Sequence, residues 1–465
     1  MHRLHYIDLF CGAGGVTTGV ENAMINDQKC ADVLACVNHD ANAIASHLEN
    51  HRGALHILED IWLADTAPIV EIVERTRREH PEDRIVLWAS CECTNYSRAK
   101  GGKPRDPDSR TLPESLFRYI EAIRPDYIEL ENVTEFLAWG PMDENNHPIS
   151  SVAGSQYVKW VNTVKSYGYE YDYRILNSAD YGAYTSRKRY FGLFHRPGLP
   201  SVFPEQTHVK RSSNTLFDDL LPWKAVRDVL DLDDEGESIF TRKKPLVDAT
   251  VRRITAGVKK FVRTDDNFLV KHFSGDDASK CISIDGPAGT VTCKDHHSIV
   301  KVVRGEQFLD NQYGHGQPTS LASPCGTVMV NPKQSLVTVK RWLMVSGYAW
   351  PSYPLDRPCP TIVASQEKSP IYIVNAVHGT LVDDKAGDSI PMRELKRFCR
   401  ENGISDIRMR MLNIRELKRI MGFPEDYVLV GTLGEQKKFI GNAVECGMAR
   451  QLCESISDRL NSLPA

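Results

Sequence analysis

The 465-residue sequence lacks the features of secreted and membrane proteins. No stretch approaches the ~20 consecutive apolar residues that a membrane-spanning helix requires. The first residues, MHRLHY, are too few and too polar before Asp8 to form a signal peptide. We therefore expect a soluble protein in the cytosol or the nucleus.

Cysteine spacing typical of disulfide frameworks or zinc modules is also missing. The 12 cysteines are scattered singly except for Cys91 and Cys93, and no two form a CxxC pair. This argues against disulfides and structural zinc. The pair His296 and His297 has no cysteine or carboxylate spacing around it that would complete a site, so we predict no metal.

The sequence has no excess of positive charge. Lys and Arg total 57 against 61 Asp and Glu, a net charge of −4, so nucleic-acid binding must depend on local clusters. Hydrophobic residues make up 41% of the chain, with 31 Gly and 25 Pro, which is near the globular average. The length predicts two to three folded domains.

The first 200 residues alternate strand-like and helix-like segments, which predicts an α/β domain with a parallel sheet covered on both faces. Helical spacing is clearest at 69–78 and 116–123. Ligands of such sheets bind beyond the carboxyl ends of the strands. The strands are expected at Leu4–Leu9, Val33–Val37, Ala54–Leu58, Ile85–Ala89, Tyr127–Leu130 and Tyr190–Phe194.

The composition changes near residue 200, where three prolines and the sequence KRSSN at 210–214 indicate a linker. Beyond it, Pro-x-x-Thr-[Val/Ile] recurs at 287–291, 324–328 and 358–362. We interpret the repeat as turn-plus-hairpin units of a β-rich domain, with chance recurrence as the alternative. Helical spacing returns at 414–421 and 443–460. The predicted domains are 1–200 completed by 400–465, and 201–399.

A glycine-rich turn follows the first strand, and polar side chains follow the second and third strands. Gly12 and Gly14 lie in the sequence DLFCGAGG, a glycine-rich turn that allows a ligand to approach the backbone. The alternative is a tight turn without a ligand. Asn38 follows the second strand and Asp60 the third, where a ribose and an amino-purine would need partners, although each also suits a helix cap.

Three further motifs follow later strands. Cys91 and Cys93 begin a loop rich in basic residues, which would lower a thiol pKa and attract phosphates, whereas an isolated cysteine is more often inert packing. Glu131, in the sequence ENV, could protonate a ring nitrogen. Arg187 and Arg189 are spaced to share one face of a strand, although such pairs are often merely solvated.

Taken in order, these segments resemble the DNA cytosine-5 methyltransferase family. The similarity extends to IRELKRIMGFPEDY at 414–427 and QKKFIGNAV at 436–444, and so spans the chain. The resemblance implies a Rossmann-like S-adenosylmethionine-dependent domain and a β-rich target-recognition domain at 201–399. It makes Cys93 the nucleophile and not Cys91, because only Cys93 has an aromatic residue three positions on and a serine four positions on.

The resemblance also implies the other site residues. Glu131 would assist the nucleophile, while Arg187 and Arg189 match two arginines of which the second contacts the cytosine O2. The implied cofactor contacts are Phe10, Gly12, Gly14, Asn38, Asp60, Ile61 and Asn442. This sequence departs from the family pattern at four positions, Asn38, Glu92, Thr94 and Thr185, which affect cofactor affinity and loop closure.

We therefore predict methylation of carbon 5 of a flipped-out cytosine in double-stranded DNA. A tRNA cytosine-5 methyltransferase and an inactive DNA-binding relative are the alternatives. The expected DNA contacts are Ser97, Arg98, Lys100, Lys103, Arg252 and Arg253, with base reading by a loop at 311–317. We expect a monomer that contacts no membrane, and a cognate restriction endonuclease is a further candidate partner.

Overall fold

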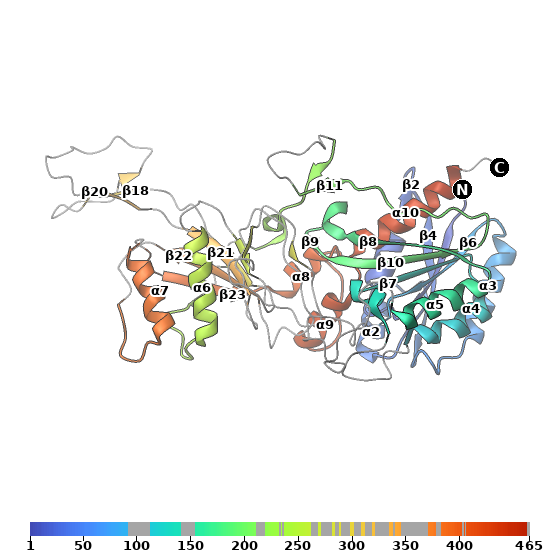
Figure 1. Cartoon of the computed structure of the whole chain (residues 1–465), viewed down its shortest axis with the longest axis horizontal. Helices are drawn as coiled ribbons and strands as arrows, with labels where there is room; N and C mark the ends of the chain where they lie inside the picture. The colour runs from blue at the N-terminus through green and yellow to red at the C-terminus, as the bar shows by residue number, and fades with distance from the viewer. Residues whose placement is uncertain are drawn as a thin grey trace. The chain divides into compact units, whose positions relative to one another are not determined.

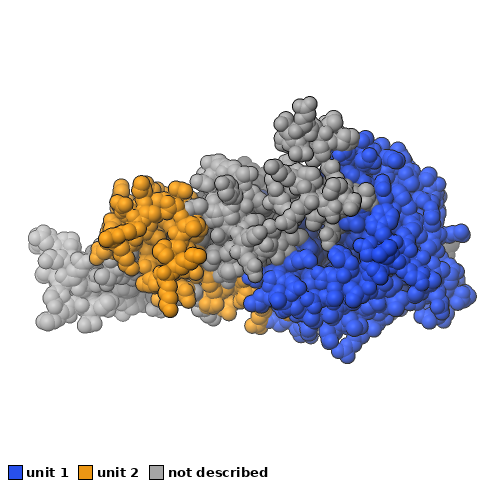
Figure 2. Space-filling view, turned by 90° about the horizontal axis from the view of Figure 1, so that it is seen from below, with its two compact units in different colours: residues 1–183, 187–222, 421–465 blue, residues 184–186, 223–420 orange. Residues whose placement is uncertain are grey.

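A computed structural model describes two compact units of the chain, coloured separately in Figure 2. The first contains 1–183, 187–222 and 421–465, and the second 184–186 and 223–420. This division differs from the predicted one, because residues 400–420 belong with the second unit. The described residues are 1–91, 112–140, 154–210, 219–231, 234, 237–261, 383–401, 404 and 406–462, with the short strands given below between 261 and 383.

The first unit is built on a seven-stranded sheet with the order β5-β4-β1-β6-β7-β10-β8. All neighbouring strands are parallel except at β10, which is antiparallel to both β7 and β8. The α/β fold predicted for this part of the chain is thus confirmed. The strands are β1 (Leu4–Leu9), β4 (Ala31–Asn38), β5 (Leu55–Leu58), β6 (Arg84–Ala89), β7 (Tyr127–Asn132), β8 (Glu170–Asn177) and β10 (Lys188–His195).

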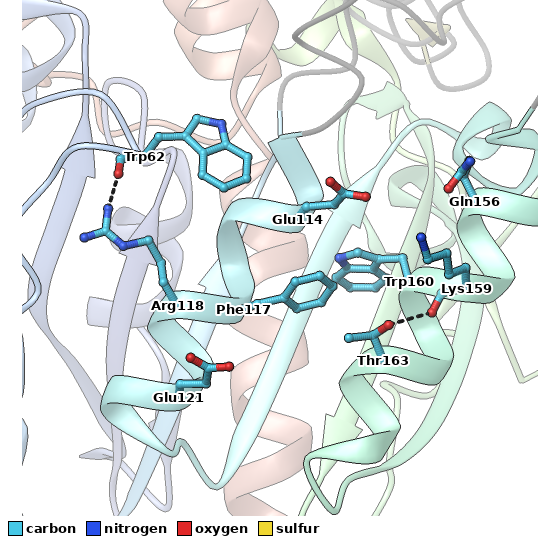
Figure 3. A pocket seen from close by; sticks show the side chains of 9 residues that line it. All are labelled: Trp62, Glu114, Phe117, Arg118, Glu121, Gln156, Lys159, Trp160 and Thr163. Atoms are coloured by element: carbon cyan, nitrogen blue, oxygen red, sulfur yellow. Dashed lines mark hydrogen bonds between the residues drawn. The ribbon is translucent and has the colours of Figure 1, made fainter.

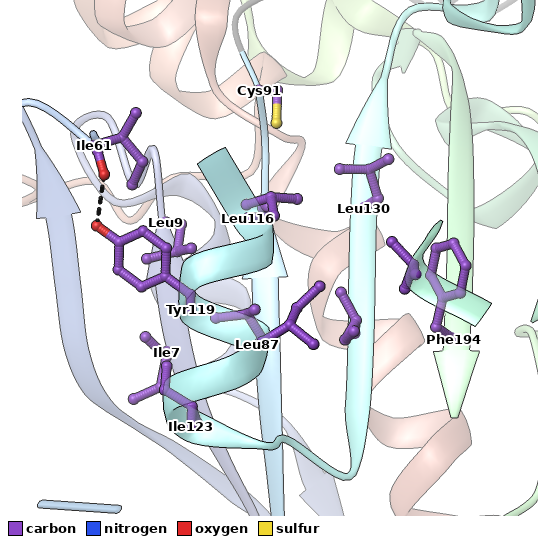
Figure 4. Packing of buried hydrophobic residues seen from close by; sticks show 14 of the residues in the cluster. Ile7, Leu9, Ile61, Leu87, Cys91, Leu116, Tyr119, Ile123, Leu130 and Phe194 are labelled. Carbon is purple, nitrogen blue, oxygen red and sulfur yellow. Dashed lines mark hydrogen bonds between the residues drawn. The ribbon is translucent and has the colours of Figure 1, made fainter. Parts of the chain in front are cut away.

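Both faces of this sheet are covered by helices (Figure 1). On one face, Leu87 and Leu130 pack with residues from α3 (Ala67–Glu79), α4 (Leu116–Ile123) and α5 (Ser155–Ser166), and Figure 4 shows part of this cluster. On the other face, Trp88 packs with α1 (Gly15–Glu21) and α10 (Cys446–Ser462). Alternate residues of each central strand therefore enter different clusters, because successive strand side chains point to opposite faces. The C-terminal helix α10 completes the first unit.

The second unit contains another seven-stranded sheet, with the order β13-β23-β22-β21-β17-β14-β15. A β-type run follows each Pro-x-x-Thr copy, at 298–302, 335–339 and 371–374, and the strands β17, β20 and β22 lie there, whereas most of the Pro-x-x-Thr turns lie outside the described residues. Its helices are α6 (Asp248–Phe261), α7 (Ile390–Glu401) and α8 (Ile414–Ile420). The strands between 237 and 411 are β13 (Glu237–Ser238), β14 (Phe268–Val270), β15 (Cys281–Ser283), β16 (Ala288–Gly289), β17 (Ser298–Lys301), β18 (Phe308–Asn311), β19 (Thr319–Ser320), β20 (Gln334–Val337), β21 (Lys340–Val345), β22 (Ile371–Val377) and β23 (Asp406–Met411).

The remaining elements are short, apart from two helices of the first unit. These are α2 (Ala41–Asn50) and α9 (Leu433–Asn442). Among the helices described, none is long and apolar enough to cross a membrane. The short elements are β2 (Met24–Ile25), β3 (Gln28–Lys29), β9 (Thr185–Ser186), β11 (His208–Val209), β12 (Leu221–Pro222) and 3-10 turns at 112–115, 134–138, 178–181 and 226–229.

Candidate active site

The glycine-rich turn follows β1 and has an unusual backbone. Phe10 has a φ of 60°, and Gly12 and Gly14 have φ values of 55° and 94°. A non-glycine residue with positive φ is uncommon, and such strained residues cluster at functional sites. A Cβ placed on Gly12 would meet no atom of the described residues within 4 Å, so the space beside this backbone is open to that extent. The turn can therefore accept a ligand close to its main chain.

The C-terminal segment of the first unit packs against this turn. The Tyr427 hydroxyl donates a hydrogen bond to the carbonyl of Ala13. A Cβ on Gly15 would lie 2.7 Å from the carbonyl oxygen of Val444 and 2.9 Å from the Ala443 Cβ. Asn442, the last residue of α9, precedes this contact and is exposed. The structure thus brings the chain just after Asn442 to the turn, and the cofactor contact of Asn442 stays a prediction.

The two polar residues after β4 and β5 take part in backbone hydrogen bonds. The Asn38 side-chain oxygen accepts from the Asp40 amide at 2.9 Å, and Asp60 accepts from the Trp62 amide at 2.8 Å. The backbone of Glu59 donates to the Asn38 carbonyl at 3.1 Å, which ties the two strand ends together. Ile61 is buried. Neither residue is a helix cap, because the N-cap of α2 is Asp40, whose side chain accepts from the Asn42 and Ala43 amides, and Asp60 opens a turn.

Cys91 ends the described part of the chain after β6, and Figure 4 shows it at one end of the hydrophobic cluster. Its side chain is buried, and its carbonyl accepts a hydrogen bond from Asn132 Nδ2 at 3.2 Å. Burial raises the pKa of the Cys91 thiol far above its usual value, and the nearby Glu131 adds to the effect. Cys91 is thus a neutral, inert thiol. Cys93, Ser97, Arg98, Lys100 and Lys103 lie outside the described residues, together with Glu92 and Thr94.

Glu131 is the centre of a buried charge cluster on β7. Its Oε1 lies 3.2 Å from Arg189 Nε and 3.8 Å from Arg187 Nη2, and all three residues are less than one-tenth exposed. Arg187 also donates to the Gly441 carbonyl at 3.1 Å. Arg189 lies in β10 and Arg187 in the one-residue gap between β9 and β10, and both guanidinium groups meet one carboxylate. The cluster fixes the orientation of all three side chains.

A second carboxyl group lies two residues earlier on the same strand. Glu129 is buried, and the Tyr6 hydroxyl donates to its Oε1 at 3.4 Å. Among the described residues its Oε2 has no hydrogen-bond partner. Burial raises the pKa of Glu129 to about 8. The sequence showed only an acidic residue in a strand here. Nothing in the pattern distinguished Glu129, which accepts from a tyrosine hydroxyl, from Glu131, which forms ion pairs with two arginines.

The other predicted positions are more scattered. Arg252 is exposed on α6, and the Arg253 side chain is not among the described ones. Thr185 is buried in β9, which pairs with β16. A surface hollow between α4 and α5 has a volume of about 450 Å³ (Figure 3). It is lined by Trp62, Glu114, Phe117, Arg118, Glu121, Gln156, Lys159, Trp160 and Thr163, none of which is a predicted site residue.

Comparison with known protein families identifies the family of this chain. The family model for C-5 cytosine-specific DNA methylases matches residues 4–458. The chain belongs to this family. The family resemblance and α/β fold inferred from sequence are thereby confirmed, and the protein is an enzyme that methylates carbon 5 of cytosine in DNA.

Individual relatives of this C-5 cytosine DNA methylase are distant. Type II methyltransferase M.AgeI of Thalassovita gelatinovora is 25% identical over 97% of this chain and 98% of its own length. Type II methyltransferase M.SacI of Streptomyces achromogenes is 25% identical over 51% of this chain and 61% of its own. Among solved structures, Entamoeba histolytica methyltransferase EhMeth gives a TM-score of 0.49 at 15% identity over 99% of both chains.

Proposed function

We propose that this enzyme attacks a cytosine that has left the DNA helix, and that Cys93 forms a temporary covalent bond to carbon 6 of the ring. The observation that supports this is the buried cluster of Glu131 with Arg187 and Arg189. It lies on β7, next to Asn132, whose side chain holds the backbone two residues before Cys93. A carboxyl group and a pair of guanidinium groups are thus fixed close to the segment that leads into the nucleophile.

Covalent attack is needed because carbon 5 of cytosine is a poor nucleophile. Addition of the Cys93 thiolate at carbon 6 breaks the C5–C6 double bond and moves its electron pair to carbon 5. Once carbon 5 carries the methyl group, a base or water removes the carbon 5 proton. The electron pair of that C–H bond restores the double bond and expels the thiolate. The inert state of Cys91 supports Cys93 as the attacking group.

The charge cluster has a defined part in this reaction. Addition of a thiolate pushes negative charge onto N3 and O2 of the ring. Glu131 shares a proton with N3, and Arg189 donates to O2, so both offset the charge that develops. Arg187 acts as a positioning residue, since its guanidinium lies between Glu131 and the Gly441 carbonyl. Because the groups are already fixed by their mutual contacts, little reorganisation accompanies the reaction.

The methyl donor we propose is S-adenosylmethionine, which supplies an electrophilic methyl group on a sulfonium when bound. The open space beside Gly12 and the strained Phe10 fit a ligand that lies against the turn. Asn38, Asp60 and Ile61, at the ends of β4 and β5, would hold its ribose and adenine, and Asn442 its amino-acid end. Asn38 offers a neutral hydrogen bond to a hydroxyl where the family pattern has an acidic residue.

Double-stranded DNA must release its target base, because stacking covers both faces of the ring. The basic segment at 98–110, which contains Arg98, Lys100 and Lys103, would contact phosphates and close over the DNA. We assign target recognition to the 201–399 region, with phosphate contacts from Arg252 and Arg253 and base reading by 311–317. We place the enzyme in a cytoplasm, as a monomer, with a cognate restriction endonuclease as a candidate partner.

Two measurements test the proposed mechanism. Purified protein is incubated with cofactor labelled in the methyl group and with duplex DNA or tRNA, and the label is counted in each. DNA containing 5-fluorocytosine then traps any covalent adduct, because fluorine at carbon 5 cannot leave as a proton. We expect label in duplex DNA and an adduct with wild type and Cys91→Ala, but none with Cys93→Ala. An adduct that survives Cys93→Ala, or label found in tRNA alone, would contradict the proposal.

A further inference from the structure

A cluster of sulfur and imidazole groups lies behind the glycine-rich turn. Cys11 comes from the turn itself, Cys36 from β4 and His47 from α2, and all three side chains are buried. One ligand atom of each lies within 4.8 Å of the other two. His56, from β5, joins them, since its Nε2 lies 2.9 Å from His47 Nδ1. Four elements therefore contribute one ligand group each.

The distances suit a four-coordinate ion. Two nitrogens bound to a tetrahedral zinc lie about 3.3 Å apart, and a sulfur and a nitrogen lie about 3.6 Å apart, given usual bond lengths. The observed separation is 2.9 Å between the His47 and His56 nitrogens and 3.7 Å between Cys36 Sγ and His47 Nδ1. Shifts of a few tenths of an ångström would bring these two pairs to the bonded separations, and the Cys11 sulfur lies within 4.8 Å of the ligand atoms of Cys36 and His47. His56 is partly exposed and gives an entry route from solvent.

The surroundings of His47 select the nitrogen that faces the cluster. The Thr17 hydroxyl donates to Asp8 Oδ2 at 2.9 Å, which leaves its oxygen to accept from His47 Nε2, also at 2.9 Å. The proton of His47 is then on Nε2, and the lone pair is on Nδ1, which points toward Cys36 and His56. Metal-binding histidines are oriented in this way by a hydrogen bond from their other ring nitrogen.

We propose that Cys11, Cys36, His47 and His56 bind one zinc ion. Thiolate and imidazole ligands in a tetrahedral set favour zinc over magnesium or calcium, which prefer oxygen. Four protein ligands leave no open position, so the role is structural: the ion would link the turn at Cys11 to β4, α2 and β5. The lack of CxxC pairs in the sequence argued against structural zinc. The structure supplies the set from separate elements instead.

The experiment uses the full-length protein, purified without a metal-affinity tag and kept reduced. Zinc per chain is measured by mass spectrometry, and cobalt is then exchanged into the site. We expect one zinc per chain, and with cobalt the intense visible absorption of a tetrahedral site together with thiolate-to-metal charge transfer. Cys36→Ser should lose the zinc, whereas Cys30→Ser, an equally buried cysteine elsewhere in the first unit, should retain it.

Two milder variants distinguish the loss of a zinc ligand from a loss of zinc caused by misfolding. His56→Asn changes a partly exposed ligand and should lower zinc affinity at least tenfold in competition with a chromophoric chelator. Thr17→Val should lower it by about 10- to 100-fold through the orienting hydrogen bond. Cys93→Ala should bind zinc as wild type does, which separates this site from the proposed nucleophile. Folded wild type that takes up neither zinc nor cobalt, or an unchanged cobalt spectrum in Cys36→Ser, would overturn the assignment.

Discussion

The Nε of Arg189 lies 3.2 Å from Oε1 of Glu131, and both residues are less than one-tenth exposed. Glu131 is on β7 and Arg189 on β10, two antiparallel neighbours in the sheet. A buried ion pair of this kind costs free energy to desolvate, and removal of one partner leaves an uncompensated charge. Its position beside the segment that leads to Cys93 makes it the main structural argument for the catalytic assignment.

The first prediction concerns Glu131→Gln, which removes the carboxylate charge but leaves two guanidinium groups buried. We expect methyl transfer to fall by about 10²- to 10⁴-fold because proton sharing with the ring is lost. The free energy of unfolding should fall by about 3 kcal/mol. Labelled-cofactor assays and denaturant unfolding measure the two effects. Glu71→Gln, at an exposed position on α3, is the matched control and should change neither.

The second prediction concerns the pH dependence of stability through Glu129. Because its pKa rises from the ordinary 4.5 to about 8 on folding, the folded state holds a proton that the unfolded state has released between these values. Stability from this group is complete below pH 4.5 and falls as the pH rises toward 8, by on the order of 1 kcal/mol per pH unit. Glu129→Gln should remove this slope.

Thermal unfolding of wild type and Glu129→Gln from pH 5 to pH 9 measures the difference. At pH 8 the variant should be the more stable of the two, because it has no buried carboxylate to ionise. Glu71→Gln should follow the wild-type curve, since its side chain is exposed. Parallel curves for wild type and Glu129→Gln would show that Glu129 does not titrate in this range.

The third prediction concerns the contact between the glycine-rich turn and the C-terminal segment. In Gly15→Ala the new Cβ would come within 2.7 Å of the Val444 carbonyl oxygen, which cannot move without the backbone. We expect a loss of about 1–3 kcal/mol, measured as a lower denaturant midpoint at unchanged slope. Gly53→Ala is the control, because a Cβ there meets no atom within 4 Å. Equal stability of the two variants would contradict this packing.

The fourth prediction concerns the exposed basic face of α6. If Arg252 contacts a phosphate, Arg252→Ala should reduce the slope of log K against log salt for DNA binding by about 1, with similar weakening for all sequences. Lys259→Ala, at another exposed position of α6, should act in the same way. Arg78→Ala, at an exposed position of α3 in the first unit, should leave the slope unchanged. A loss of sequence choice with an unchanged slope would point to base contacts instead.

The apolar runs were sufficient to locate six of the seven strands of the first sheet. β1, β4, β5, β6, β7 and β10 all coincide with runs read from the sequence. The edge strand β8 was missed, because most of its residues are at least partly exposed and it has no continuous apolar run. Tyr173 and Ile175, for example, are both exposed. The edge position alone does not explain the miss, because the other edge strand, β5, was located from its apolar residues.

The candidate site could be predicted only in part from the sequence. Spacing placed Arg187 and Arg189 on one face of a strand, but no local pattern could show that both would meet Glu131. The helix-cap alternative for Asn38 and Asp60 is wrong, because Asp40 caps α2 and each of the other two side chains only accepts from the amide two positions on. The separate environments of Glu129 and Glu131 could not be predicted from the sequence, because the two residues are of the same type and lie two positions apart on the same face of β7.

Sequence alone determined the order of the motifs, the parallel sheet and the family, because these depend on local spacing and on residue identity along the chain. The tertiary structure decided which groups meet. It paired Glu131 with Arg189, buried Cys91 as a neutral thiol, and gathered Cys11, Cys36, His47 and His56 from four elements. Such contacts join residues far apart in the chain, and only the packing of the sheet and its helices brings them within bonding distance.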